Sequence, residues 1–256
     1  MNKVVIIGCG NVGMSYAYAL LNQSTAVNEL VLIDLNKKRI EGEVMDLNHC
    51  LAFAPSKIDI KAGDYSDCKN AKIVVIAAGA NQDIGETRND LIYKNAKIFK
   101  EIISNVMNEG CDGIFLVATN PLDVMTYLTY KYSKLPSNQV IGTGTSLDTS
   151  RLRYMLGEKL NMNPTLINPR FITKLDEELL ENLKQNHEIV ITLEDGILDG
   201  GFCEKIARFY SDTNIKVKNY GIKKAFYDKY NVNEVLQENK LTPEQLAKEI
   251  EEVIKK

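Results

Sequence analysis

The chain has 256 residues, a formal net charge of −3 and 25% charged residues. This length allows one large domain or two smaller ones, with a sizeable apolar interior. Acidic and basic residues are interspersed, so the sequence has neither the basic footprint of a nucleic-acid-binding protein nor a polybasic membrane patch. We therefore expect no nucleic-acid partner and no membrane partner.

The five cysteines are odd in number, scattered along the chain and without a CxxC pair. Neither a disulfide framework nor a zinc site is therefore expected, and no metal is predicted. No apolar run approaches the length that a bilayer requires, and the chain starts directly on a predicted strand without a signal-type segment. These features predict a cytoplasmic protein.

The first predicted elements are a strand over Lys3 to Ile7, a glycine-rich turn at 8–13 and a helix over Met14 to Leu21. This order is typical of a dinucleotide site, where the helix N-terminus offers free N–H groups and a partial positive charge to phosphates. Gly8 permits a tight turn, and Gly10 allows the backbone to approach a pyrophosphate closely. Gly13 allows the helix to pack closely on the strand.

A second predicted strand, Leu30 to Ile33, ends at Asp34, which follows Gly13 by 21 residues. A carboxylate at this spacing can accept hydrogen bonds from an adenosine ribose, and its charge would repel the 2′-phosphate of NADP. The glycines alone could form an ordinary turn. Together with the flanking strand, the helix and Asp34, they predict NAD as the cofactor.

Further apolar runs alternate with longer helical patterns, which predicts a parallel sheet covered by helices. The expected strands are Ile73 to Ala77, Gly113 to Ala118 and Gln139 to Ile141, and the expected helices are Asp90 to Asn108 and Asp148 to Leu160. Ligands of such sheets bind at the carboxyl ends of the strands. We expect the polar residues that follow the strands to meet there, namely Asp64, Gly79 to Arg88, Asn120 and Thr143 to Asp148.

Residues 1–163 resemble the NAD-binding domain of bacterial L-lactate dehydrogenases. Five motifs carry the resemblance: GCGNVG at 8–13, GDYSD at 63–67, AAGANQDIGETRNDL at 77–91, ATNPLD at 118–123 and GTGTSLDTSRLRY at 142–154. The resemblance implies a Rossmann-type doubly wound parallel sheet. It also implies that NAD is contacted by Gly8, Gly10, Val12, Gly13, Asp34, Arg39, Tyr65, Gly79, Ala80 and Asn120.

The same resemblance implies a site for a small 2-hydroxy or 2-oxo acid such as lactate or pyruvate. Arg88 matches a residue on a mobile loop that polarises the substrate carbonyl, and Arg151 matches the one that grips the carboxylate. Asp148 matches the residue that orients the catalytic histidine. Asn120 matches a contact to both substrate and nicotinamide, and Gln82 matches the position that prefers a small methyl group.

These roles make chemical sense, because a guanidinium stabilises the charge that develops on a carbonyl oxygen, and a second one holds a planar carboxylate with two hydrogen bonds. Other interpretations rest on the residues alone. Arg88 could be a solvated surface charge, Arg151 with Arg153 a charged helix face, and Asn120 a helix cap.

The proton donor of the resembled family is absent. That family takes it from a histidine in a Gly-Glu-His-Gly motif, and the motif does not occur here. Of the two histidines, His49 is expected as a partly exposed helix residue and His187 as a residue at the end of a strand. Neither is a good proton donor, so we predict weak or absent turnover.

Residues 165–256 resemble the C-terminal domain of 1-deoxy-D-xylulose-5-phosphate synthase, a transketolase-type enzyme. The matching stretches are TLINPRFITKLDEELL at 165–180, HEIVITLEDGILDGGF at 187–202 and TPEQLAKEI at 242–250. The resemblance implies a second, smaller α/β domain over 164–256 that lacks its first strand and helix and helps to form a homodimer. The Gly-Asp-Gly element that binds thiamine diphosphate in that class is absent, so thiamine catalysis has no support.

In this second region the pattern predicts three strands and three helices. The strands are Leu166 to Ile167, Ile189 to Leu193 and Ile215 to Val217, and the helices are Glu177 to Gln185, Phe202 to Tyr210 and one from Thr242 onward. Thr242 and Gln245 form a predicted capping box. Gly200 and Gly201 could form either an anion-binding turn or a tight strand-to-helix connection.

Three functions compete. The first is an NAD-dependent L-lactate dehydrogenase, and the second is a chimera, natural or engineered, that binds the nucleotide without effective catalysis. The third is a non-enzymatic or transketolase-type dimerisation module. We favour an NAD-binding, lactate-dehydrogenase-like protein with impaired turnover.

Overall fold

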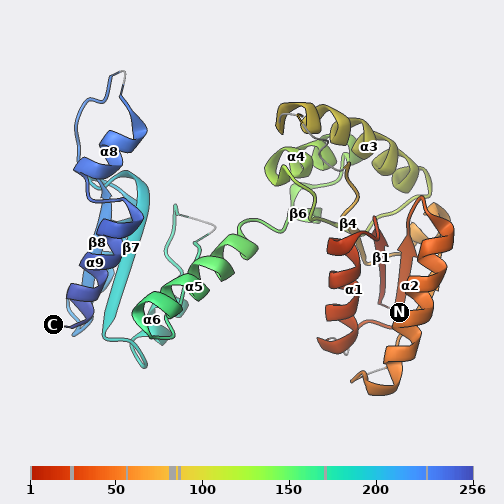
Figure 1. Ribbon diagram of the computed structural model, residues 1–256, viewed down its shortest axis with the longest axis horizontal. Helices are drawn as coiled ribbons and strands as arrows, with labels where there is room; N and C mark the ends of the chain where they lie inside the picture. Colours follow the sequence, from red (N-terminus) through yellow and green to blue (C-terminus); the bar gives the residue numbers. More distant parts are fainter. Residues whose placement is uncertain are drawn as a thin grey trace. The chain divides into compact units, whose positions relative to one another are not determined.

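A computed structural model of the chain describes residues 2–23, 26–55, 57–80, 85, 88–169, 172–228 and 230–255 (Figure 1). Of Arg88 and Asn89 it describes the backbone alone. The chain divides into two compact units, Met1–Ser146 and Leu147–Lys256, each with its own sheet. We describe each unit by itself.

The first unit contains a parallel sheet of six strands in the order β3-β2-β1-β4-β5-β6. The strands are β1 (Lys3–Ile7), β2 (Glu29–Ile33), β3 (Asp59–Ala62), β4 (Ile73–Ile76), β5 (Ile114–Val117) and β6 (Val140–Gly142). Val5 on β1 lies opposite Val31 on one side and Val74 on the other. The order reverses between β1 and β4, which makes this the doubly wound parallel sheet predicted from the sequence, with β3 as an additional strand at one edge.

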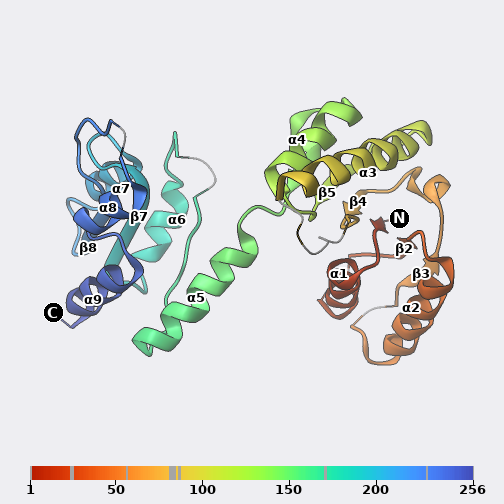
Figure 2. The same cartoon turned by 45° about the horizontal axis from the view of Figure 1, so that its top comes forward.

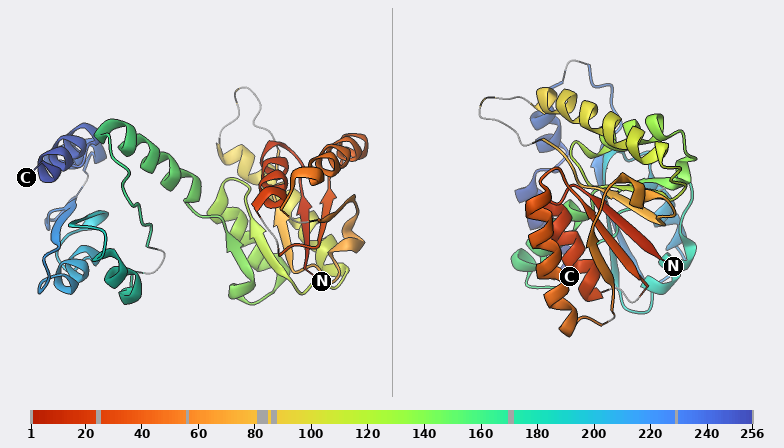
Figure 3. Two further views of the ribbon diagram at one scale, coloured as in Figure 1. Left: turned by 90° about the horizontal axis from the view of Figure 1, so that it is seen from below. Right: turned by 90° about the vertical axis from the view of Figure 1, so that its right-hand side faces the viewer.

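Helices cover both faces of this sheet, as the right-hand view of Figure 3 shows. The helices are α1 (Asn11–Gln23), α2 (Lys37–Cys50), α3 (Arg88–Asn108) and α4 (Leu122–Ser133), with short 3₁₀ turns η1 (Leu51–Phe53), η2 (Tyr65–Cys68) and η3 (Ser137–Gln139). Because side chains alternate along a strand, Ile6 of β1 packs in the core with α1 and α2, whereas Val5 packs in the core with α3 and α4. Burial on both faces explains why the strands read as continuous apolar runs.

The second unit is built on two parallel strands, β7 (Ile189–Ile197) and β8 (Lys216–Ile222). Its helices are α5 (Ser146–Leu160), α6 (Glu177–Leu183), α7 (Phe202–Phe209), α8 (Val232–Glu238) and α9 (Pro243–Ile254) (Figure 2). A small core joins Leu180, Ile206 and Tyr210. The Tyr210 hydroxyl donates to the backbone oxygen of Leu180 at 2.8 Å, so this buried polar atom is satisfied.

Most elements predicted for the second unit are present, but one strand is not. Residues 163–169 are irregular, so the predicted strand over Leu166 to Ile167 is wrong. Two apolar residues do not define a strand unless a neighbouring backbone pairs with them, and here the segment is tied to the start of β7 by side chains, with Thr165 Oγ1 2.8 Å from His187 Nε2. The capping box of Thr242 and Gln245 is confirmed at the start of α9.

The first unit ends at Ser146, so α5 belongs almost wholly to the second unit, whereas the sequence motifs predict a boundary between the two families at 163/164. In the part of the chain that the structure describes, none of the helices combines the length and the apolar character needed to cross a bilayer.

Candidate dinucleotide site

The glycine turn at 8–13 joins β1 to α1 at the point where the strand order reverses. Gly8 has a φ of +94°, and a Cβ atom there would overlap the backbone nitrogen of Ala78. A Cβ atom on Gly13 would overlap the backbone oxygen of Gly8. A Cβ atom on Gly10, by contrast, would meet no protein atom within 4 Å. Packing within the protein therefore requires Gly8 and Gly13, whereas Gly10 faces open space at the start of α1.

Asp34 lies directly after β2 and faces this turn. Its carboxylate accepts hydrogen bonds from the backbone N–H of Cys9 at 2.8 Å and of Asn36 at 3.0 Å. Two donors hold the carboxylate in a fixed position, half-buried at the carboxyl ends of the strands. Arg39 lies in the first turn of α2, where its guanidinium pairs with Glu43 at 3.2 Å.

The thiol of Cys9, inside the turn, is buried. Burial and the neighbouring Asp34 carboxylate raise its pKa to about 12. The side chain therefore stays neutral at physiological pH and adds no charge beside Asp34. Among the residues that the structure describes, Asp34 carries the only charged side chain in the turn of residues 8–13 and at the end of β2.

These features fit an adenine dinucleotide. The first turn of α1 supplies free backbone N–H groups and a partial positive charge, which suit a pyrophosphate, and the bare backbone at Gly10 leaves it room. The Asp34 carboxylate is an acceptor for ribose hydroxyls. Val12, in the same turn of α1, is 57% exposed and adds an apolar surface beside the crevice.

Residues that follow β4 and β5 lie at the same carboxyl edge of the sheet as the glycine turn. Gly79 and Ala80 follow β4, and Asn120 follows β5 with an exposed side chain. The buried Asn95 of α3 bonds both loops, since its Oδ1 accepts from Ala80 N at 2.8 Å and its Nδ2 donates to Asn120 O at 2.9 Å. Thr119 adds a third tie, from its hydroxyl to the backbone oxygen of Ala78 at 2.8 Å.

The sequence reasoning missed Asn95. A signal was present, because Asn95 occupies a core-facing position of α3 in line with Ile92 and Phe99, where an apolar residue is the rule. A polar residue at such a position indicates a buried hydrogen-bonding role. Its partners, however, are backbone groups that only the folded chain brings close.

Other predicted residues have different surroundings. Tyr65 is half-buried in η2, packs against the core beside α3 and hydrogen-bonds Asn105, and burial raises its pKa. Gln82 and the side chain of Arg88 lie outside the described residues. The backbone of Arg88 starts α3. The N-cap residue of α4 is Pro121, so the interpretation of Asn120 as a helix cap is wrong.

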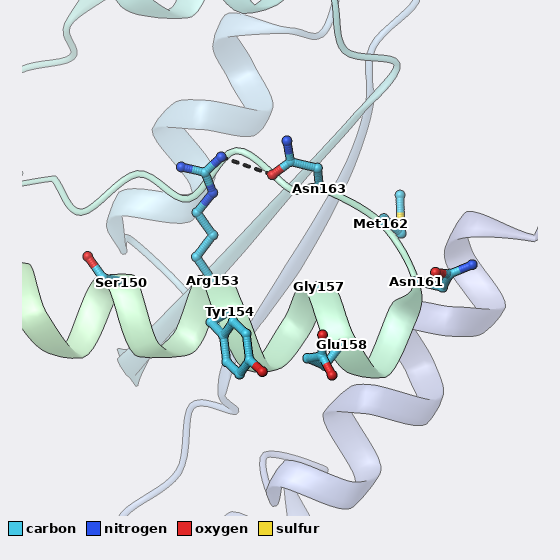
Figure 4. A pocket seen from close by; sticks show the side chains of 8 residues that line it. All are labelled: Ser150, Arg153, Tyr154, Gly157, Glu158, Asn161, Met162 and Asn163. Carbon is cyan, nitrogen blue, oxygen red and sulfur yellow. Dashed lines mark hydrogen bonds between the residues drawn. The ribbon is translucent and has the colours of Figure 1, made fainter.

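Asp148 and Arg151 lie on α5. Arg151 Nη1 is 3.6 Å from Asp148 Oδ1, and both side chains are about two-thirds exposed or more, at 66% and 70%. Further along the same helix Arg153 donates to Asn163 Oδ1 at 2.9 Å and lines a concavity of about 660 Å³ between the helix and the turn that follows it (Figure 4). The arginines of α5 thus have partners on α5 itself or in the segment that follows it.

The two histidines lie where the pattern predicted. His49 is exposed in the last turn of α2. His187 precedes β7, with Nδ1 3.2 Å from Leu183 O and Nε2 2.8 Å from Thr165 Oγ1. Its ring therefore joins the end of α6 to the segment before it.

The turn at Gly200 and Gly201 is filled by the protein itself. The carboxylate of Glu194 accepts from Phe202 N at 3.1 Å and from Cys203 N at 3.4 Å, at the start of α7. This finding favours the tight strand-to-helix connection over an anion-binding turn. Across the described stretches, no group of three or more His, Cys, Asp or Glu side chains is arranged to hold a metal ion.

The parallel six-stranded sheet and the glycine turn at its switch point define a Rossmann-type dinucleotide-binding domain. The sequence model described as "lactate/malate dehydrogenase, NAD binding domain" matches residues 2–142. The chain belongs to this family, and its cofactor is NAD. A second model, the transketolase C-terminal domain, matches residues 137–246, so both models include 137–142. Both resemblances noted in the sequence are thereby confirmed.

Individual relatives agree. The chain is 55% identical to the L-lactate dehydrogenase of Halalkalibacterium halodurans over 166 residues, which are 65% of this chain and 53% of the relative. It is 57% identical to that of Borrelia turicatae over 162 residues, 63% of this chain and 51% of the relative. The chain spans about half the length of the curated relatives it matches.

Solved structures show the same extent of similarity. A lactate dehydrogenase enzyme from a Medee basin deep-sea metagenome library is 56% identical, with a TM-score of 0.60, over 63% of this chain and 51% of that one. The minor L-lactate dehydrogenase of Enterococcus mundtii, in its ligand-bound form, is 48% identical, with a TM-score of 0.61, over 64% and 52%.

Proposed function

We propose that the chain is a lactate-dehydrogenase-like NAD-binding protein whose reduction of 2-oxo acids is weak or absent. The observation that supports it best is the turn of residues 8–13, with Asp34 bonded to Cys9 and open space at Gly10. Gly8, Val12 and Gly13 shape this turn, and Asp34 would take the adenosine ribose. The loops at Gly79, Ala80 and Asn120 would take the other end of the cofactor, and Arg39 and Tyr65 would add further contacts to it.

NAD supplies a hydride acceptor or donor when bound. The remaining chemistry belongs to the protein. We propose that Arg88 polarises the substrate carbonyl, Arg151 holds the carboxylate, and Gln82 selects a small side chain, as in the related dehydrogenases. Lactate or pyruvate is the substrate that this set favours.

Two features argue for impaired turnover. The chain has no Gly-Glu-His-Gly motif, so no positioned histidine supplies the proton that the carbonyl oxygen requires. Asp148, which would orient that histidine, pairs instead with Arg151 at 3.6 Å. Its charge would then oppose binding of a second carboxylate by the same guanidinium.

The binding site can be tested with one substitution that the protein itself tolerates. A Gly10→Ala side chain would meet no protein atom, so the variant should fold as stably as the natural chain. It would nevertheless fill the space proposed for the pyrophosphate. We expect calorimetric titration with NADH to give binding for the natural chain and at least tenfold weaker binding for Gly10→Ala, about 1.4 kcal/mol.

Gly42 provides a matched control. It also faces open space, but it lies on α2, away from the turn. Gly42→Ala should leave NADH binding unchanged. Absence of NADH binding to a folded natural chain would refute the proposal. If Gly10→Ala bound NADH as tightly as the natural chain, the pyrophosphate would not bind at Gly10.

For the second unit we propose a dimerisation role, with its family boundary near 163/164. The match to the transketolase C-terminal domain from residue 137 onward suggests that α5 occupies the place of that domain's first helix. Exposed apolar residues on β7, Leu193 at 58% and Ile197 at 41%, offer a contact surface. Sedimentation of the full chain should show a dimer that Leu193→Lys weakens, and a monomer at all concentrations would refute this role.

A further inference from the structure

Asn95 is a buried polar residue in the middle of α3. It is 1% exposed, and the helix face on which it lies otherwise packs apolar residues such as Phe99 into the core. An amide in such a position destabilises the fold unless its polar atoms find partners. The side chain is therefore held there by specific hydrogen bonds.

Both ends of the amide are used. Oδ1 accepts from the backbone N–H of Ala80 at 2.8 Å, and Nδ2 donates to the backbone oxygen of Asn120 at 2.9 Å. One partner needs an acceptor and the other needs a donor, so only one orientation of the amide satisfies both. A carboxylate, a hydroxyl or an alkyl group of similar size cannot make this pair of bonds in the same way.

The two partners belong to loops far apart in the sequence. Ala80 follows β4, and Asn120 follows β5, so Asn95 fixes the spacing of neighbouring loops at the carboxyl edge of the sheet. Gly79 is part of the same arrangement, because a Cβ atom there would lie 2.9 Å from Thr119 Cγ2 and 3.4 Å from Asn95 Oδ1.

The loops fixed by Asn95 lie on one side of the switch point only. Asp34 follows β2, on the other side of β1, where the adenosine end of the cofactor is proposed to bind. A dinucleotide that spans the switch point must place its remaining half over β4 and β5. Asn95 can therefore affect the two ends of the cofactor differently.

We propose that Asn95 is a positioning residue that holds the loops after β4 and β5 at the spacing required by the nicotinamide half of NAD. The inference rests on the proposed NAD site. Asn95 itself does not reach the cofactor, because its side chain is buried and both of its polar groups are bonded to backbone. Its effect acts through Gly79, Ala80 and Asn120.

The test compares two ligands on the full chain. NADH occupies both halves of the site, whereas ADP occupies only the adenosine and phosphate half. In calorimetric titrations we expect Asn95→Ala to bind NADH at least tenfold more weakly than the natural chain and to bind ADP within twofold. NADH fluorescence provides a second readout, since enhancement and blue shift on binding report the surroundings of the nicotinamide ring.

Asn108→Ala is the matched control, because Asn108 lies on the same helix with an exposed side chain. It should change neither affinity. If Asn95→Ala does not fold, Asn95→Leu fills a similar volume on this apolar helix face without a buried charge and removes both hydrogen bonds. The same loss of NADH relative to ADP is expected of it.

The outcomes separate this inference from the proposed function. A natural chain that binds neither ligand would overturn both. A natural chain that binds both ligands, with variants at Asn95 that keep its NADH-to-ADP affinity ratio, would overturn only the role of Asn95. Equal weakening of both ligands would likewise overturn it, because a general structural defect does not distinguish the two halves.

Discussion

The carboxylate of Asp34 accepts a hydrogen bond from the backbone N–H of Cys9 at 2.8 Å, and so joins the end of β2 to the glycine turn after β1. One residue therefore does two things in this site. It shapes the turn, and it places a negative charge where we propose that the adenosine ribose binds.

Substitution of Asp34 should change the choice of cofactor. In Asp34→Arg a cation replaces a charge that repels a 2′-phosphate, so we expect the affinity for NADPH relative to NADH to rise at least tenfold, about 1.4 kcal/mol. The affinity for NADH itself should fall, because the turn loses an acceptor. Asp34→Asn keeps an acceptor oxygen without the charge and should give an intermediate ratio. An unchanged ratio in calorimetry for Asp34→Arg would contradict the assignment.

Reduction of pyruvate should be slow. Loss of a positioned general acid costs roughly 10² to 10⁴ in rate, and we expect at least that deficit against an intact lactate dehydrogenase. NADH absorbance with excess pyruvate measures it. His187→Ala is the critical control, because the ring of His187 is engaged with Leu183 and Thr165 and should contribute nothing. If the natural chain turned over pyruvate as fast as an intact lactate dehydrogenase and His187→Ala abolished that activity, His187 would be the proton donor and the prediction would be wrong.

Lys61 should stabilise the first unit in a pH-dependent way. Its ammonium lies 3.0 Å from both Glu29 on β2 and Asp67 in η2, and these partners raise its pKa. Exposed pairs of this kind contribute about 0.2 to 1 kcal/mol each, so Lys61→Met should lower the free energy of unfolding at pH 7 by up to about 2 kcal/mol.

The sign of the pH dependence follows from the raised pKa. The contribution of Lys61 is complete below the ordinary lysine pKa of about 10.4 and is lost as the pH rises through the higher value in the folded state. Urea unfolding should therefore show a smaller difference between the natural chain and Lys61→Met at pH 11 than at pH 7. Lys72→Met, at another exposed lysine of the same unit, serves as the control. A difference that grows with pH would contradict the ion-pair account.

The cysteines should differ in reactivity. Cys9 and Cys203 are buried with pKa values raised to about 12, so their thiolate fraction at pH 8 is about 10⁻⁴. Cys50 is half-buried. Brief treatment with iodoacetamide, followed by peptide mass analysis, should find Cys50 modified first, and the urea-unfolded chain should be modified at all five. Native modification of Cys9 at the rate of Cys50 would contradict the turn described for it.

The sequence predicted the elements that local patterns specify. The strand Lys3–Ile7 is confirmed with the same bounds, because its β-branched run is short, ends at a glycine and buries all four of its apolar residues. The strand Asp59–Ala62 was missed, since it lies at the sheet edge and only one of its four residues is buried, with the charged Asp59 and Lys61 on either side of Ile60. Leu166 and Ile167 were predicted as a strand from two apolar residues, a pattern too short to show whether a partner exists.

The site divides along the same line. The spacing of Gly8, Gly13 and Asp34 can be recognised from the sequence alone. In the structure the two glycines lie against backbone atoms, and Asp34 accepts a hydrogen bond from Cys9 in the turn. Asn95 hydrogen-bonds residues 15 and 25 positions away in the sequence. Its partners are backbone groups, which every residue has, so the sequence does not indicate which residues they belong to. The pairing of Asp148 with Arg151 follows from their spacing of three residues on a helix, whereas the family resemblance implies a separate role for each.

The strand order also bears on synthesis of the chain. β2 pairs with β1, β3 with β2, β4 with β1, β5 with β4, and β6 with β5 at the outer edge. Each strand after β1 therefore pairs with a strand that precedes it in the chain, and no pairing within this sheet needs a segment beyond β6. The nucleotide-binding sheet can close before β7 and β8 are translated, so the nascent chain acquires the fold of its first unit without any contribution from the second.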